Sequence, residues 1–521
     1  MSVWVGIDLG TQSVRAMAVT GDGEVLGTAA RPLTSRRDGD RHEQDPERWW
    51  DQLAAACAEA LANVEPARVA GVAVDATSGT ILLTTKDGAP VTPALMYDDR
   101  RAAAELDRVN DVGGQVWARL GYQRMQANWA LPKLLWLLRS AGPGVRLAHQ
   151  SDFVTRRLAG EPVATDLSNA LKTGVDLIAE DWPTAVMDAL GVPPDVLPPV
   201  VRPGARIGSV CARAARETGL PEGTPILAGT TDGCAAQLGA GAIRVGSWNS
   251  VLGTTLVLKG VTRDLIHDPL GVVYSHRAPD GSWLPGGASS TGTGVLSAAL
   301  PGRDLTALSR EATIRDHATR RSTDRERTGR KSGDHARAGR GSADREGSGL
   351  EGSGRWSGNQ GRAGRSVPSV IYPLVSPGER FPFAAADARS FTLGTPADDV
   401  ETYMAILRGA AYVERLCFDY LDLLGAPVDG EIILTGGATR SAYGNQLRAD
   451  VLGRPVTLRE TAEPALGMAA LAASADLART REIVEPRPRD AEPYLRFVEE
   501  LRARGWLDER VARHATERTR A

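Results

Sequence analysis

Residues 3–20 read VWVGIDLGTQSVRAMAVT, and the fold depends on how this stretch is interpreted. Two apolar runs flank a polar turn, a pattern typical of a β-hairpin. Asp8 ends the first run, and Gly10, Thr11 and Gln12 follow it. Gly10 lets backbone N–H groups approach an anion, and a divalent cation could bridge Asp8 to a phosphate. The turn therefore fits a magnesium–nucleotide loop, although an ordinary hairpin with a self-satisfied turn is the simpler interpretation of these residues alone.

The bulk composition is that of a globular protein with several domains. A chain of 521 residues is too long for one hydrophobic core and predicts two or three domains. The net charge of −3 gives no general attraction to nucleic acid or to an anionic membrane. Four scattered cysteines and seven histidines without ligand spacing argue against a disulfide framework or a zinc site. No apolar run approaches the roughly 18 residues of a membrane span, so we expect a cytoplasmic protein with no membrane partner.

Two polar turns follow predicted buried strands in the first half of the chain. The strand at 69–74 ends in DATSGT (75–80), and the short strand at 225–228 ends in GTTDG (229–233) before a small-residue helix. Open α/β sheets bind ligands at such strand ends. Asp232 in the second turn can therefore lie at the floor of a cleft, although its position also suits a helix cap.

The second half repeats the opening pattern. Residues 246–258 form another predicted hairpin, with Gly253 and Thr254 at its tip. A further strand is followed by Gly436, Gly437 and a helix, an order that lets a nucleotide lie against the backbone. Two such hairpins, one in each half, indicate a duplicated architecture whose halves face each other across phosphates. The match is short, so as a sign of a repeat it is weak.

The composition changes between Arg310 and Arg365. This stretch contains 14 Arg or Lys and 8 Asp or Glu residues in a background of Gly, Ser and Ala. Because it offers almost nothing apolar to bury, we expect a disordered insertion. An arginine- and glycine-rich arm can touch RNA, but Trp356 is the only aromatic residue here and the acids dilute the positive field. A neutral insertion is the simpler interpretation.

In this order, the pieces resemble the FGGY family of carbohydrate kinases. The resemblance covers nearly the whole chain apart from the insertion and the C-terminal tail, and five motifs together are far more specific than any one. The motifs are GIDLGT (6–11), YDDR (97–100), GTTDG (229–233), GTT (253–255), and TGG (435–437) leading to QLRAD (446–450).

The resemblance implies an α/β protein with two actin/hexokinase-like (ribonuclease H-like) domains, an interdomain cleft and a disordered insertion. We expect an N-terminal domain for sugar and phosphate at 1–243 and a C-terminal nucleotide domain at 244–478. The insertion would occupy 305–366, and a helical tail would occupy 479–521.

The resemblance also implies roles for individual residues. Gly10, Thr11 and Gln12 from the first domain, and Gly253 and Thr254 from the second, would hold the phosphates of ATP.

Gly436, Gly437 and Ser441 would border the adenosine. Asp8 would lie on the sugar side and orient Mg²⁺, through water. Asp232 would be the catalytic residue, bind the sugar, share the metal, and accept the proton of a primary hydroxyl as it attacks the γ-phosphorus. ATP and Mg²⁺ are the expected cofactors.

The turn at 75–80 is the basis for inferring the identity of the acceptor sugar. Glycerol kinases have Arg-Glu where this chain has Thr77 and Ser78, and typical bacterial xylulokinases carry Met-His near this turn. DATSGT, together with SNALKTG (168–174), is more similar to the pentulose-kinase-like branch of cyanobacteria and plant plastids, which is associated with D-ribulose. Ser78 would bond a sugar hydroxyl. Asp99 belongs to the sugar-side cluster, although Tyr97 stands where tryptophan is common.

The implied reaction is therefore ATP-dependent phosphorylation of D-ribulose to D-ribulose 5-phosphate, with D-xylulose or another polyol or sugar as the alternative. A non-catalytic sugar sensor or an RNA-associated scaffold is a second class of function, but a scaffold would have no need of Asp8, Thr11 and Asp232 together. We expect a small-molecule sugar and ATP as ligands, no nucleic-acid partner, and a monomer or homodimer.

Overall fold

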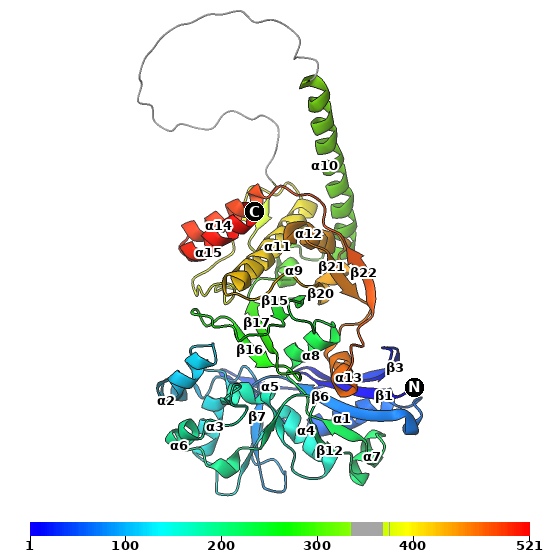
Figure 1. Cartoon of the computed structure of the whole chain (residues 1–521), viewed down its shortest axis with the longest axis vertical. Coiled ribbons are helices and arrows are strands. Elements are labelled where there is room, and N and C mark those ends of the chain that lie inside the picture. The colour runs from blue at the N-terminus through cyan, green and yellow to red at the C-terminus, as the bar shows by residue number, and fades with distance from the viewer. Residues whose placement is uncertain (335–367, 375, 521) are drawn as a thin grey trace, which may run out of the picture.

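The structure is a computed structural model that describes residues 1–334, 368–374 and 376–520. The chain forms two stacked halves, each built on a mixed β-sheet with helices against it (Figure 1). No helix in these ranges is both long and apolar enough to cross a membrane.

The N-terminal half is built on a six-stranded sheet in which β1 is central. β1 pairs antiparallel with β2 and parallel with β6, so that Asp8 lies beside Asp75 in the register. In spatial order the strands are β12 (Arg206–Ser209), β13 (Pro225–Leu227), β6 (Val69–Ala76), β1 (Val3–Leu9), β2 (Ser13–Thr20) and β3 (Val25–Pro32).

The C-terminal half repeats this connectivity in a seven-stranded sheet. β14 pairs antiparallel with β15 and parallel with β20, as β1 pairs with β2 and β6, and antiparallel β17 corresponds to β3. The predicted duplication is therefore present in the topology. The strands in order are β16 (Tyr274–Arg277), β17 (Trp283–Ser289), β15 (Leu256–Gly260), β14 (Trp248–Leu252), β20 (Ile432–Thr435), β21 (Val456–Arg459) and β22 (Thr480–Val484).

Smaller sheets and local helices complete the N-terminal half. A five-stranded sheet contains β4 (Arg36–Asp38), β5 (Arg41–Gln44), β8 (Ala94–Leu95), β7 (Ile81–Thr84) and β9 (Arg146–His149), and β10 (Thr165–Asp166) pairs with β11 (Val200–Val201). The α-helices are α1 (Pro46–Ala60), α2 (Leu106–Arg119), α3 (Ala130–Leu138), α4 (Gln150–Ala159), α5 (Leu167–Ala170), α6 (Thr184–Leu190), α7 (Ala212–Thr218) and α8 (Asp232–Gly239). α1 begins after an Asp45 cap with Pro46 in its first turn, two residue types that favour a helix start.

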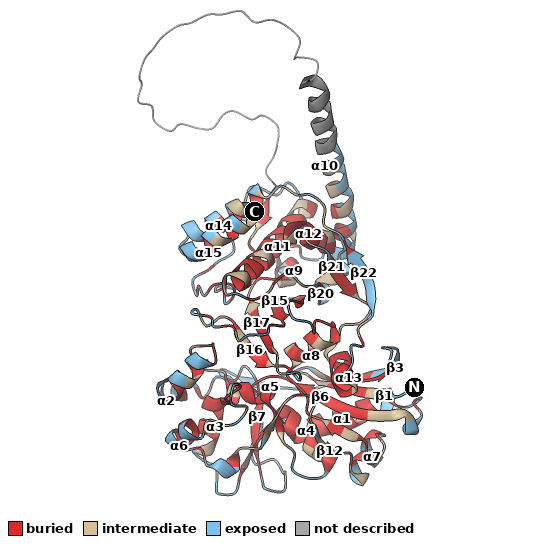
Figure 2. Ribbon diagram, in the orientation of Figure 1, coloured by how far each residue is buried: buried red, intermediate tan, exposed pale blue. Residues whose placement is uncertain are grey.

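The helices of the C-terminal half include α11, most of whose residues are buried and which contacts α9, α10, α12, α14 and α15. The helices are α9 (Leu296–Ala299), α10 (Leu305–Asp334), α11 (Asp399–Leu423), α12 (Ala442–Leu452), α13 (Pro464–Ala473), α14 (Glu492–Ala503) and α15 (Glu509–Arg520); β18 (Val370–Ile371) pairs with β19 (Thr392–Leu393). Buried residues concentrate in the strands and in α11 to α13 (Figure 2).

The last segment of the chain is part of this C-terminal core. The predicted tail at 479–521 starts with β22, an edge strand of the large sheet. Phe497 and Leu501 of α14 are buried in the same cluster as α11, and the hydroxyl of Tyr494 hydrogen-bonds the carboxylate of Asp419. The segment is therefore part of the C-terminal domain. The apolar face of α14 packs into the core of that domain, so the segment does not form a separate tail.

Two small-residue helices, α8 and α13, join the halves. α13 follows the C-terminal sheet in sequence but packs on β1 and β6, which places it across the boundary predicted at 243/244 (Figure 1). A Cβ added to Gly6 would lie 1.8 Å from the carbonyl oxygen of Ala465, and one added to Gly467 would lie 1.9 Å from that of Ala235. Backbone contact at this junction thus requires glycine.

The start of the predicted disordered insertion is folded. Residues 305–334 form α10, and Leu308 and Ala312 are buried in the C-terminal core. The apolar spacing of these two residues and of Leu305 is obscured when composition is averaged over the whole arginine-rich stretch. The part of the predicted insertion at 335–366 lies outside the described residues.

Candidate active site

Three carboxyl groups meet where parallel strands end. Asp8 is the penultimate residue of β1, Asp75 lies beside it on β6, and Asp232 opens α8 directly after a parallel bridge between Ala76 and Thr231. Strand ends of open sheets collect ligand-binding groups in this way. The resemblance implies a metal shared by Asp8 and Asp232, and that shared role stays a prediction.

The cluster carries more potential negative charge than a buried site tolerates. Burial, and next the neighbouring Asp232, raise the pKa of Asp8 to about 6. Burial and the Asp8 charge raise the pKa of Asp75 well above its usual range. Burial also raises the pKa of Asp232, whereas the Gly233 N–H, Lys172 and Lys259 oppose that rise. The site is therefore suited to a ligand that brings positive charge.

Magnesium fits this site only in combination with a nucleotide. Among the residues that the structure describes, no group of three or more acidic, histidine or cysteine side chains is arranged to hold a metal alone. Mg²⁺ commonly keeps several waters and is bound through one or two carboxylates and substrate phosphates. Asp8 and Asp232 could supply these carboxylates, and both oxygens of buried Asp75 lack a hydrogen-bond partner in the described chain.

The first predicted phosphate loop joins β1 to β2. The Gly10 N–H donates to the Ser13 carbonyl at 3.0 Å, which closes the turn, and the Thr11 hydroxyl lies 3.5 Å from that of Thr77. Gln12 is exposed. The turn therefore lies next to the turn at 75–80 and the acidic cluster, at the edge of the sheet where β1 and β6 end. A phosphate would approach the site at this edge.

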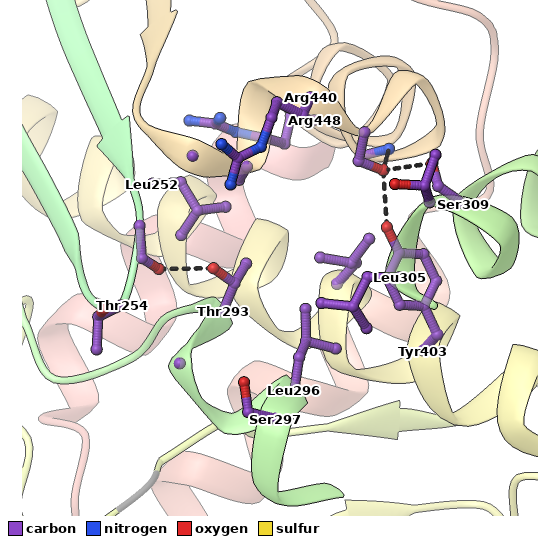
Figure 3. Close-up of a pocket in the computed structure, with 18 residues that line it drawn as sticks. Leu252, Thr254, Thr293, Leu296, Ser297, Leu305, Ser309, Tyr403, Arg440 and Arg448 are labelled. Carbon is purple, nitrogen blue, oxygen red and sulfur yellow. Dashed lines mark hydrogen bonds between the residues drawn. The ribbon is translucent and has the colours of Figure 1, made fainter. Parts of the chain in front are cut away.

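The second predicted phosphate loop lines a cavity of about 510 Å³ in the C-terminal half (Figure 3). Gly253, Thr254, Gly437 and Ser441 all line this cavity. The Gly253 carbonyl accepts a hydrogen bond from the Thr293 hydroxyl at 2.7 Å. Four of the five C-terminal residues predicted to bind ATP thus share one cavity.

The fifth residue, Gly436, shapes the wall from behind. Its φ is +84°, and an added Cβ would lie 2.6 Å from the Leu252 carbonyl oxygen, so only glycine fits between β20 and β14. Ser441 caps α12 by accepting the Gly444 N–H at 3.0 Å. Its hydroxyl also lies 2.9 Å from those of Ser309 and Tyr403, as the dashed lines in Figure 3 show.

The sequence prediction missed most of this cavity. The additional lining residues are Leu252, Thr293, Gly294, Leu296, Ser297, Leu305, Thr306, Ser309, Tyr403, Leu407, Ala438, Arg440, Gly444 and Arg448. Leu305, Thr306 and Ser309 belong to α10 and were assigned to the disordered insertion. Arg448 was quoted within a motif without a role; its guanidinium pairs with buried Glu414 at 2.7 Å, and its Nη1 has no partner in the described chain.

The predicted sugar-side residues differ in what they can offer a ligand. The Ser78 hydroxyl is buried and has no hydrogen-bond partner among the described residues, so it is available. Both oxygens of Asp99 are already engaged by Arg101, and Oδ2 also accepts the His42 N–H at 2.7 Å. Asp99 therefore supports the loop that carries Tyr97, and its contact with a sugar stays a prediction.

Lysines near Asp232 were also missed. Lys172 Nζ donates to the Ser78 carbonyl at 3.2 Å, and burial is the main cause that lowers its pKa to about 8. Lys259 enters from β15 in the other half. Lys133 holds the carbonyls of Gly79 and Met96 at 2.7 and 2.8 Å. A single lysine in an apolar strand or short helix forms no repeating pattern, so the sequence alone does not identify it as a site residue.

Comparisons with known proteins agree with this architecture. The sequence pattern of the FGGY family of carbohydrate kinases matches residues 3–239 for its N-terminal domain and 249–475 for its C-terminal domain. A xylulose kinase of Streptomyces rubiginosus is 33% identical over 294 residues, which are 54% of this chain and 59% of that protein. A xylulose kinase of Escherichia coli (strain K12) is 26% identical over 485 residues, covering 90% of this chain and 89% of that one.

Solved structures show the same fold over nearly the full length. The crystal structure of a xylulose kinase from Rhodospirillum rubrum superposes with a TM-score of 0.75 at 25% identity and covers 96% of this chain and 98% of that one. A Plasmodium falciparum glycerol kinase with ADP gives 0.76 at 15% identity over 97% and 98% of the two chains, which shows the fold alone. With both domain patterns matched, the chain belongs to the FGGY family of carbohydrate kinases.

Proposed function

We propose that this protein transfers the γ-phosphoryl group of ATP to the terminal hydroxyl of a ketopentose. The observation that carries the proposal is the juxtaposition of Asp232 with the Asp8 hairpin, at the junction of two halves that each supply a glycine–threonine loop. Phosphoryl transfer needs alignment and charge neutralisation more than covalent chemistry from the protein. A glycine–threonine loop from each half would align the phosphates and neutralise their charge. The Asp232 carboxylate would accept the proton.

In the proposed mechanism, the sugar lies between Ser78 and Asp232. Asp232 accepts the proton of the terminal hydroxyl while that oxygen attacks the γ-phosphorus and the bond to the ADP oxygen breaks. When bound, Mg²⁺ would supply positive charge to the phosphates, and Asp8 and Asp232 would hold it. The loops at Gly10 and Gly253 direct backbone N–H groups at the phosphates. Burial keeps water away from the phosphoryl group, which would otherwise be hydrolysed.

Two ketopentoses fit this proposal. Relatives named xylulose kinase favour D-xylulose as the acceptor. The turn at 75–80, which lacks the Met-His pair of typical bacterial xylulokinases and presents the free hydroxyl of Ser78, supports D-ribulose as the second candidate. The two sugars differ at one stereocentre, so a small change in this turn can change which of them the site prefers.

The test is a coupled ADP-release assay over D-xylulose, D-ribulose, matched pentitols and glycerol. The proposal predicts ADP release that depends on a ketopentose and on added Mg²⁺, with one of the two sugars preferred. A preference for glycerol, or ADP release that no sugar changes, would contradict it.

A further inference from the structure

Lys259 of β15 is a buried lysine whose ammonium group finds no hydrogen-bond acceptor among the described residues. The residue is 8% exposed. The nearest aromatic group is the Tyr274 ring, whose centroid lies 5.8 Å from Nζ. Burying an ammonium group without an acceptor is costly, so a lysine retained in this state indicates a ligand that supplies one.

The fold makes room for this side chain. Lys259 pairs with Gly286 of β17, and a Cβ on Gly286 would lie 2.8 Å from Lys259 Cγ. A Cβ on Gly233, the residue after Asp232, would lie 3.0 Å from Lys259 Cε. The lysine therefore runs between two glycines from the C-terminal sheet to the first turn of α8, where the proposed base lies.

The groups around the ammonium come from both halves. Asp232 of α8 and Lys172, which lies in the 3₁₀ turn Leu171–Thr173, interact with it electrostatically, and buried His276 of β16 is affected by both lysines. His276 is held by the Ser168 hydroxyl at 2.8 Å. An oxygen placed between Lys172 and Lys259 would therefore meet two ammonium donors, and the Asp232 carboxylate, the acceptor beside them, is engaged by the terminal hydroxyl in the proposed mechanism.

This environment discriminates between kinds of oxygen. An ammonium donates three hydrogen bonds and accepts none. A keto oxygen only accepts hydrogen bonds, so it is well matched to an ammonium group. A hydroxyl must also find an acceptor for its own hydrogen. In a ketopentose the keto group at C2 is three carbon–carbon bonds from the C5 hydroxyl, so Asp232 and Lys259 can contact the two ends of one substrate.

We propose that Lys259 binds the keto oxygen of the acceptor sugar and makes the site select ketopentoses over pentitols. This inference rests on the proposed function, since it names the substrate atom that the C-terminal half would recognise. A carboxylate oxygen shares the same chemistry, so a pentonate is the competing source of the acceptor oxygen.

The test compares Lys259→Met with wild type, using D-xylulose against xylitol and D-ribulose against ribitol. Loss of a hydrogen bond to a charged donor should lower kcat/KM for the ketopentose by about 10- to 100-fold. The value for the pentitol should change by less than about threefold. Lys259→Gln, which keeps a neutral N–H donor, should restore part of the ketose preference. Lys86→Met, at an exposed turn, is the matched control and should behave as wild type.

Binding measurements separate this inference from the proposed function. Calorimetric titration of the same sugars and of D-xylonate into each variant, without ATP, should show the ketose preference in wild type and its loss in Lys259→Met, even if no turnover is found. Equal losses for ketose and pentitol, or no loss, would overturn the proposal. Tighter binding of D-xylonate than of D-xylulose, abolished by Lys259→Met, would overturn the keto assignment and point to a carboxylate.

Discussion

The proposed mechanism gives Asp232 and Asp8 different tasks although their side chains lie in one cluster. Asp232 has two lysines in its surroundings, which favour its ionised form, and its Oδ1 accepts the Gly233 N–H at 2.7 Å. Burial, and next the neighbouring Asp232 charge, raise the pKa of Asp8, and Asp75 and Arg15 oppose this rise only in part. The proposed mechanism uses Asp232 as the base and Asp8 as a carboxylate whose charge a bound cation would favour.

The replacement Asp232→Asn removes the proposed base and keeps the shape of the side chain. We expect kcat with the preferred ketopentose to fall by about 10²- to 10⁴-fold, the range typical of general-base catalysis. The affinity for ADP without Mg²⁺ should not change, because the cavity proposed for the nucleotide lies in the other half. Coupled ADP release and calorimetry measure the two quantities, with exposed Asp51→Asn as control. Turnover near that of wild type in Asp232→Asn would exclude the assigned role.

Asp8 should reduce stability where it is ionised. Its pKa is raised from 3.8 to about 6 in the folded protein, so the folded state binds more protons than the unfolded state between these values. The free energy of unfolding therefore falls as pH rises from about 4 to 6, by up to about 3 kcal/mol, and stays reduced above pH 6. Asp8→Asn should remove the Asp8 contribution, so its stability should fall less than that of wild type between pH 4 and 6, and it should raise the melting temperature at pH 7.5 while lowering Mg²⁺-dependent turnover. A wild-type stability that is flat from pH 4 to 6 without ligands would contradict this.

At the scale of elements, the junction between α8 and α13 determines how the two halves meet. Both helices consist mainly of small residues, and their backbones contact each other and β1 so closely that several positions exclude a side chain. Because the backbones are in contact, α8 and α13 can move little relative to each other. Relative movement of the halves must then be absorbed at the ends of these helices, near Asp232 and Glu463.

Two glycine-to-alanine replacements test the junction. Alanine is favoured over glycine in a helix by about 1 kcal/mol. Gly114→Ala in α2 has open space and should stabilise the protein by up to that amount, whereas Gly467→Ala in α13 would place a Cβ 1.9 Å from the Ala235 carbonyl oxygen and should destabilise it by about 2 kcal/mol or more. Chemical denaturation of both variants measures the difference. A Gly467→Ala protein at least as stable as wild type would show that the helices do not pack as described.

Sequence could predict the elements whose signal is local. The Asp8 hairpin, the Gly253 hairpin and the Gly436 turn each combine strand, glycine and polar residues within a few positions, and all lie where they were expected. α10 was missed because its buried residues stand at the start of a stretch whose average composition is polar. The occupation of Asp99 by Arg101 and the position of Lys259 depend on distant strands, which one sequence does not report.

At the scale of the whole molecule, the proposed site is divided between the halves. The acidic cluster and Ser78 belong to the first half, and the nucleotide cavity and Lys259 belong to the second. Productive geometry therefore depends on both halves approaching the ligands together, which also excludes water.

Ligand-induced closure should be visible in solution. We expect the radius of gyration from X-ray scattering to decrease when a non-hydrolysable ATP analogue, Mg²⁺ and the preferred ketopentose are present together, and to change less with either ligand alone. The Gly114→Ala protein is a suitable control, since its replacement is far from the junction. An unchanged radius with all ligands bound would indicate a site that forms without closure.

The most direct measurement is to identify the product by ³¹P NMR and mass spectrometry after incubation with ATP, Mg²⁺ and D-xylulose or D-ribulose. We predict one pentulose 5-phosphate formed for each ADP released with wild type, and an initial rate of product formation lower by about 100-fold or more with Asp232→Asn. ADP formed together with inorganic phosphate instead of a sugar phosphate, or equal product from wild type and Asp232→Asn, would contradict the proposed phosphoryl transfer.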